Sequence, residues 1–73
     1  MNTINFYSKN NHNKVIEIKQ FNNRFVYWLF PEANNYPTLK DKLHIYSNSE
    51  EITLTDGYNL IKDLKRKVNL YSD

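Results

Sequence analysis

The feature that most constrains the fold is an unbroken run of six apolar residues, Phe25 to Phe30, in the first half of the chain. Aromatic and β-branched residues are enriched in strands, and a strand that is apolar on both sides has to be covered on both sides. Pro31 follows the run directly and ends it, because proline cannot donate a hydrogen bond to a strand ladder. The run predicts a strand over 24–30 at the centre of a sheet, and a single layer of helix cannot cover both of its faces.

Two further strands are predicted before this run, over 3–7 and 14–21. In both segments apolar residues alternate with polar or charged ones, which is typical of a strand with one buried face. The polar segment 8–13 and the pair at 22–23 are rich in asparagine, which tolerates the left-handed backbone of tight turns. Three strands joined by two hairpins are therefore expected.

The middle of the chain predicts a loop followed by one or two short strands. Residues 31–41 contain asparagines and two prolines, a composition typical of irregular loops. Apolar and polar residues then alternate over 42–47, which predicts a fourth strand, and again over 51–55, which predicts a short fifth strand after a turn at Asn48 and Ser49.

One amphipathic helix is predicted over 56–71. Apolar residues recur there at every third or fourth position, as one face of a helix requires. They are Tyr58, Ile61, Leu64, Val68 and Tyr71. Thr53 or Thr55 could provide the helix N-cap in place of the fifth strand. Asp63 precedes Lys67 by one turn, so the two can form an ion pair on the helix surface.

These elements predict an α+β fold, with an antiparallel sheet of four to five strands and one C-terminal amphipathic helix packed on one face, in a single domain over 1–73. The residues expected under the helix are Ile4, Phe6, Ile16, Ile18, Leu43 and Ile45. In the central strand we predict that Trp28 points inward and Tyr27 outward, because an indole buries more area and a phenol tolerates a wet edge.

Several kinds of site lack their residues in this sequence. Cysteine is absent, and neither His12 nor His44 has partners at metal-ligand spacing. The single glycine cannot build a phosphate-binding loop, and no serine lies in a nucleophile elbow. We expect no metal site, no cofactor and no catalytic residue, and hence a protein that is not an enzyme.

The sequence also predicts where the protein works. No segment approaches the roughly 20 apolar residues of a membrane span, and the first residues do not resemble a secretory signal. A small domain without cysteine fits a reducing compartment better than an oxidising one. We expect a cytoplasmic protein with no membrane contact, in the host cytoplasm if a phage encodes it.

The candidate binding residues are exposed aromatic and basic side chains, which are enriched among the residues that dominate protein interfaces. We expect them on the outward sheet face, on the long loop and on the basic side of the helix. They are Tyr7, Lys19, Tyr27, Tyr36, His44, Tyr46, Lys62 and Arg66.

The function predicted from these features is that of a small inhibitor that occupies the surface of a host protein. Abundant asparagine and an excess of lysine over arginine are typical of AT-rich coding sequences, including those of phages and mobile elements. The expected target is a defence or nucleic-acid-processing protein, as for an anti-CRISPR or another anti-defence protein. The alternatives are a single-stranded DNA or RNA-binding module that uses the aromatic and basic sheet face, and a homodimer whose second sheet face is its own interface.

Overall fold

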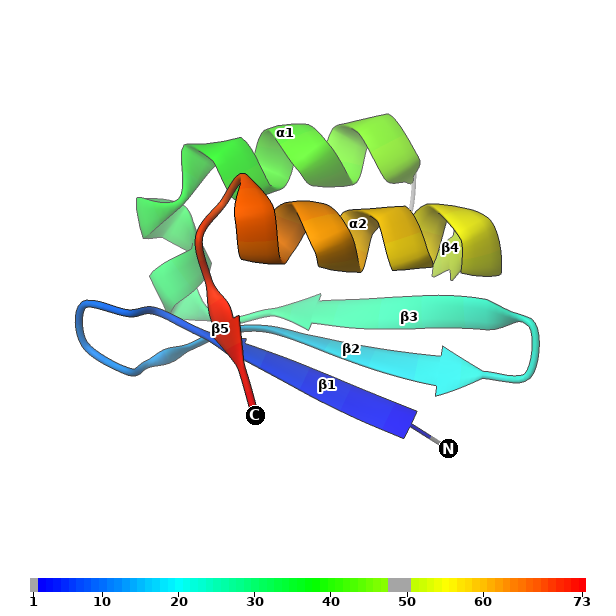
Figure 1. Cartoon of the computed structure of the whole chain (residues 1–73), viewed down its shortest axis with the longest axis horizontal. Coiled ribbons are helices and arrows are strands. Elements are labelled where there is room, and N and C mark those ends of the chain that lie inside the picture. Colours follow the sequence, from blue (N-terminus) through cyan, green and yellow to red (C-terminus); the bar gives the residue numbers. More distant parts are fainter. Residues whose placement is uncertain (1, 48–50) are drawn as a thin grey trace.

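The protein has an α+β fold in the computed structural model, which describes residues 2–47 and 51–73. The strands within these residues are β1 (Asn2–Tyr7), β2 (Lys14–Phe21), β3 (Arg24–Leu29), β4 (Glu51–Thr53) and β5 (Tyr71–Ser72). The helices are the 3-10 helix η1 (Pro31–Asn35), α1 (Pro37–Tyr46) and α2 (Leu54–Arg66). Both α-helices lie on the same side of the sheet (Figure 1).

The described strands form one antiparallel sheet in the order β4-β3-β2-β1-β5. β1, β2 and β3 are joined by hairpins, and Asn22 adopts the left-handed backbone in the second of them, with a φ of 51°. The antiparallel sheet of up to five strands is thus confirmed. The strand predicted at the centre of the sheet, over 24–30, is β3. That prediction was wrong by one strand, because β5 pairs with β1 and so places β2 in the middle.

The register between β2 and β3 decides which aromatic residues face the helices. Tyr27 lies opposite the buried Ile18 and packs against the core. Trp28 lies opposite Glu17 and is 43% exposed. The prediction that Trp28 points inward was therefore wrong: Phe25 is buried on the helix side, and the alternation of side chains along a strand then places Trp28 on the other face.

The predicted loop and fourth strand are replaced by η1 and α1. Leu39 and Leu43 lie one helical turn apart and are both buried, whereas Ile45 is 68% exposed. Pro37 stands in the first turn of α1, where its missing N–H costs no helical hydrogen bond. The apolar alternation over 42–47 misled the strand prediction because it is too short to distinguish period two from the helical period. The turn predicted at Asn48 and Ser49 lies outside the described residues.

The helix predicted over 56–71 is shorter and begins earlier. Thr53 ends β4 and also caps α2, since its hydroxyl accepts a hydrogen bond from the Asp56 N–H at 3.3 Å. Beyond α2, Asn69 has a φ of 64° and the Leu70 N–H donates to the Leu64 carbonyl at 3.0 Å, as at many helix ends. The chain then enters β5, so it ends in a strand and has two α-helices where one was predicted.

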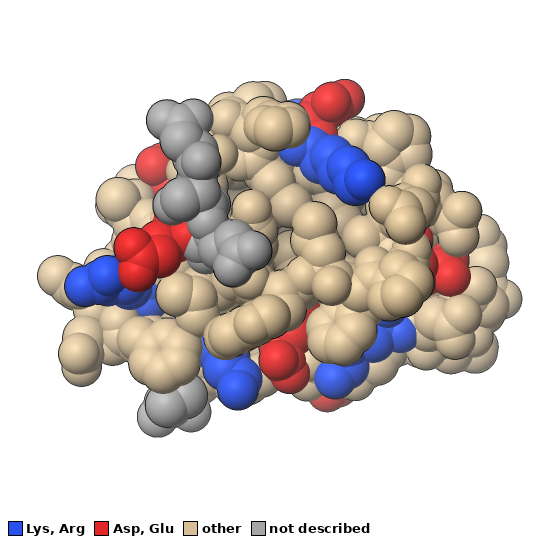
Figure 2. Space-filling model, turned by 180° about the vertical axis from the view of Figure 1, so that it is seen from behind, with Lys and Arg blue, Asp and Glu red and all other residues tan. Residues whose placement is uncertain are grey.

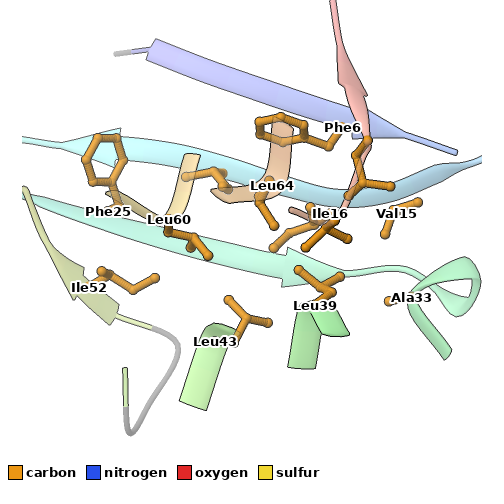
Figure 3. Packing of buried hydrophobic residues seen from close by; sticks show 13 residues of the cluster. Phe6, Val15, Ile16, Phe25, Ala33, Leu39, Leu43, Ile52, Leu60 and Leu64 are labelled. Carbon is orange, nitrogen blue, oxygen red and sulfur yellow. The ribbon is translucent and has the colours of Figure 1, made fainter. Parts of the chain in front are cut away.

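The core lies between the sheet and the two helices (Figure 3). α1 contributes Leu39 and Leu43, while α2 contributes Leu60 and Leu64. The remaining buried apolar residues are Phe6, Val15, Ile16, Ile18, Phe25, Ala33, Ile52, Val68 and Leu70. The buried face of α2 thus includes Leu60, which the predicted apolar stripe omitted, and leaves Tyr58 52% exposed.

Candidate interaction surface

The side of the sheet turned away from α1 and α2 has no helix over it (Figure 1), and we call it the outer sheet face. Cross-strand pairing places on this face every second residue of the three long strands. They include Thr3, Asn5 and Tyr7 of β1, Lys14, Glu17, Lys19 and Phe21 of β2, and Arg24, Val26 and Trp28 of β3.

Trp28 is a large aromatic residue of the outer sheet face, near the end of β3 and beyond the residues that pair with β4. Its side chain is 43% exposed, and the Lys19 ammonium lies 5.3 Å from its ring centroid. A cation at that distance over an indole is attracted by the electrons of the ring. The contact holds the indole against the sheet while leaving much of it open to a partner.

A second aromatic and basic pair lies at the beginning of β2. The Lys14 ammonium is 5.2 Å from the centroid of the Phe30 ring and 3.8 Å from a carboxylate oxygen of Glu17. Beside it is an open hollow of about 500 Å³ between the first hairpin and η1. Hydrogen bonds from the side chains of Asn11, Asn35 and Asn13 lower the pKa of Glu32, which lines this hollow.

At the other edge of the outer sheet face, aromatic residues join β1 to β5. The Tyr7 and Tyr71 rings are stacked with their centroids 5.4 Å apart, and the Tyr71 hydroxyl oxygen is 2.8 Å from Nδ1 of His12. The Tyr7 hydroxyl donates to a carboxylate oxygen of Asp73 at 3.2 Å. Burial and this hydrogen bond raise the pKa of Tyr7 above its ordinary value.

The eight predicted binding residues do not form one surface. Tyr7 and Lys19 lie on the outer sheet face as predicted. Tyr27 faces the helices and packs against the core, so its predicted outward position was wrong. His44 and Tyr46 were expected on the sheet surface, but both lie on α1 because 37–46 is a helix.

The remaining predicted residues also lie on the helix side or beside the core. Tyr36 precedes α1, packs against the core and donates its hydroxyl hydrogen to the buried Ser8 side chain at 2.6 Å. Lys62 and Arg66 are exposed on α2. Trp28 and Tyr71 of the outer sheet face were not among the predicted binding residues. Side chains alternate along β3, so a buried Phe25 would have indicated that Trp28 lies on the opposite face.

Charge is unevenly divided between the two sides of the sheet. α1, α2 and the C-cap Lys67 together carry six basic and three acidic residues, while the rest of the chain carries four basic and five acidic ones. Figure 2 shows basic and acidic groups interspersed with uncharged surface on the side of the molecule opposite to the view of Figure 1. The excess of positive charge therefore belongs to the helices.

Two further findings concern metal binding and membrane crossing. Among the described residues, no three His, Asp or Glu side chains come close enough to hold a metal ion. In the same part of the chain, no helix combines the length and the apolar character that crossing a membrane requires. The chain matches no protein-family model, no curated protein and no solved structure.

Tyr46 links α1 to α2, and its removal is expected to lower stability in a pH-dependent way. Its hydroxyl donates to Asp63 at 2.6 Å, and this hydrogen bond, with the charge of Lys67, holds the pKa of Asp63 below its ordinary value of 3.8. A carboxylate with a lowered folded-state pKa stabilises the fold above its unfolded-state pKa, and this contribution is lost as the pH falls through the folded-state value.

Tyr46→Phe is therefore expected to lower the urea midpoint at neutral pH, and the difference from the wild type should shrink in acid. Urea unfolding followed over a series of pH values measures this. In an Asp63→Asn background the same substitution should show no such pH dependence. An equal loss at every pH in both backgrounds would contradict the assignment.

The predicted ion pair between Asp63 and Lys67 is confirmed, with a nitrogen to oxygen distance of 3.8 Å.

Proposed function

We propose that the protein is a non-enzymatic binding protein that attaches to another protein through its outer sheet face. The observation that supports this most is Trp28, a 43% exposed indole on a sheet surface that no helix covers. Tryptophan and tyrosine dominate the binding energy of many protein interfaces, because they bury a large area at a small cost in conformational entropy. Tyr7 and Tyr71 supply a second aromatic group on the same face.

The charges of this face favour a protein partner over a nucleic acid. Lys14 is paired with Glu17, and Arg24 is paired with Glu51 at 2.7 Å. The ammonium group of Lys19 lies over the Trp28 ring, where a stacking base would have to displace it. A surface with balanced charges attracts phosphate groups only weakly, because phosphate binding depends on an excess of cations.

The biological setting that we propose is inhibition of a host protein by a phage or mobile element, with an anti-CRISPR or another anti-defence protein as the example. The small size and the asparagine-rich, lysine-rich composition support this setting. An inhibitor that works by covering a surface needs one complementary face and no catalytic group. The expected partner is a nucleic-acid-processing or defence protein in the host cytoplasm.

Trp28→Ala is expected to weaken binding of the protein partner by about 30-fold or more, the effect of truncating an interface hot spot. The partner is captured from host lysate, identified and purified, and its affinity is then titrated against the wild type and the variant. Ile45→Ala is the matched control, since Ile45 is an exposed apolar residue on the helix side. Equal affinities of all three proteins would overturn the proposal.

The oligomeric state provides an independent check of the same face. Size-exclusion chromatography with light scattering is expected to give a monomer for the wild type and for Trp28→Ala. A wild-type dimer that Trp28→Ala converts to a monomer would instead show that the outer sheet face is a homodimer interface. In that case the protein partner proposed here would have to bind elsewhere.

A further inference from the structure

We propose that the exposed side of α2 binds the phosphate backbone of a nucleic acid through Lys62 and Arg66, with the ring of Tyr58 beside them. This surface lies on the helix side of the sheet, whereas Trp28 lies on the outer sheet face (Figure 1). The inference therefore concerns a second binding surface and does not depend on the protein partner proposed above.

The three residues form one stripe along α2. They are spaced four residues apart, so each lies about 6 Å further along the helix axis, on nearly the same side. All three are exposed, and Tyr58 is 52% exposed although its ring edge contacts Phe25. Arg66 stands in the last turn of α2, where the helix dipole favours a cation, but Lys62 lies before that turn and is repelled by Arg66 one turn away.

The cations of this stripe are not neutralised by acids of the helices. Within the described residues, neither Lys62 nor Arg66 forms an ion pair, and the neighbouring Lys65 forms none. Asp63 is the acidic residue next in the chain to Lys62, but its carboxylate is engaged by Tyr46 and Lys67. Among the acidic residues that the structure describes, none forms an ion pair with the stripe, so its positive charge is available to an anionic ligand.

A nucleic acid fits this stripe better than an acidic protein or an anionic membrane does. Phosphate groups repeat along a strand and match a row of cations, while an exposed tyrosine ring offers a surface on which a base can stack. A membrane-bound helix would need an exposed apolar face, and the apolar residues Leu60 and Leu64 of α2 are buried in the core. Charge complementarity together with Tyr58 therefore selects the nucleic acid.

Fluorescence anisotropy with labelled single-stranded and double-stranded oligonucleotides tests the inference. Two phosphate contacts predict that affinity falls about tenfold between about 50 mM and about 200 mM salt. Lys62→Glu with Arg66→Glu should remove binding at low salt. The matched control is Lys9→Glu with Lys19→Glu, which changes the net charge equally but lies outside α1 and α2, and this variant should keep most of the affinity.

Three outcomes would overturn the inference. In the first, neither oligonucleotide binds at low salt. In the second, the two charge-reversed variants lose the same amount of affinity. In the third, oligonucleotides do not bind, and the α2 variant alone loses binding of an acidic protein partner. Circular dichroism of both variants confirms that they are folded. Trp28→Ala should leave oligonucleotide binding unchanged, so failure of this inference can be told apart from failure of the proposed protein-binding function.

Discussion

Replacing Gly57 by alanine is expected to destabilise the protein by about 1–3 kcal/mol, although alanine favours a helix by about 1 kcal/mol over glycine. Gly57 lies in the first turns of α2 and faces β3. A Cβ atom built at this position would overlap the Phe25 ring, which is itself 3% exposed and held in the core. The ring or the helix would have to move, and a close-packed core resists either movement.

A double-mutant cycle tests this explanation. In a Phe25→Ala background the ring is absent, so Gly57→Ala should become neutral or stabilising, as helix propensity predicts. Urea unfolding followed by the fluorescence of Trp28, the single tryptophan, gives the free energy of unfolding of all four proteins. The same loss in both backgrounds would show that the overlap with Phe25 is not the cause.

Gly57 also explains why the buried face of α2 differed from the prediction. The close approach of the helix to Phe25 places Gly57, Leu60 and Leu64 toward the sheet. Tyr58 is rotated by about 100° from Gly57 around the helix, so its ring lies at the margin of the core, against Phe25 and half exposed. The predicted stripe was based on apolar side chains only. Glycine has no side chain and does not contribute to such a pattern, although here it determines which face of the helix is buried.

The three long strands were predictable because each depends on local pattern. Alternation over 3–7 and 14–21 and the asparagines at 22–23 agree with β1, β2 and the turn between β2 and β3. The alternation is interrupted at one place, where a bulge in the pairing of β1 with β2 leaves both Val15 and Ile16 buried. Such a bulge inserts one residue into a strand, which a strict period of two cannot foresee.

α1 and β5 were missed because tertiary packing decided them. The buried Leu39 and Leu43 fit a helical turn, but the predicted loop before residue 42 separated them. Tyr71 continued the apolar spacing of α2, yet Asn69 adopts the left-handed backbone that ends the helix and directs Tyr71 to the edge of β1. Proline at a helix start and asparagine after a helix end were the local signals for both elements.

The candidate surface was predictable in composition but not in arrangement. Exposed aromatic and basic residues were expected, and Tyr7 and Lys19 lie on the outer sheet face. The third aromatic or basic residue beside them is Trp28 and not Tyr27, because the register between β2 and β3 turns Trp28 outward and Tyr27 inward. Because 37–46 is the helix α1, His44 and Tyr46 leave the predicted sheet patch and lie on the helix side, where Lys62 and Arg66 were expected.

Leu64→Ala is expected to cost about 2–5 kcal/mol, because it deletes a buried side chain from the middle of the core. Leu64 is 0% exposed and lies among Phe6, Ile16 and Leu60 (Figure 3). A chain of 73 residues has a total stability of about 4–11 kcal/mol, so one such cavity can consume much of it. No disulfide compensates for the loss, because the sequence contains no cysteine.

Leu29→Ala provides the matched control, since it makes the same chemical change at a leucine that is 43% exposed. It should lower the free energy of unfolding by less than about 1 kcal/mol, because a half-exposed side chain loses little burial and leaves no closed cavity. Both variants are measured by urea unfolding. Equal shifts of the urea midpoint would mean that Leu64 contributes no more to the free energy of unfolding than a half-exposed strand residue does. The core would then not be centred at Leu64.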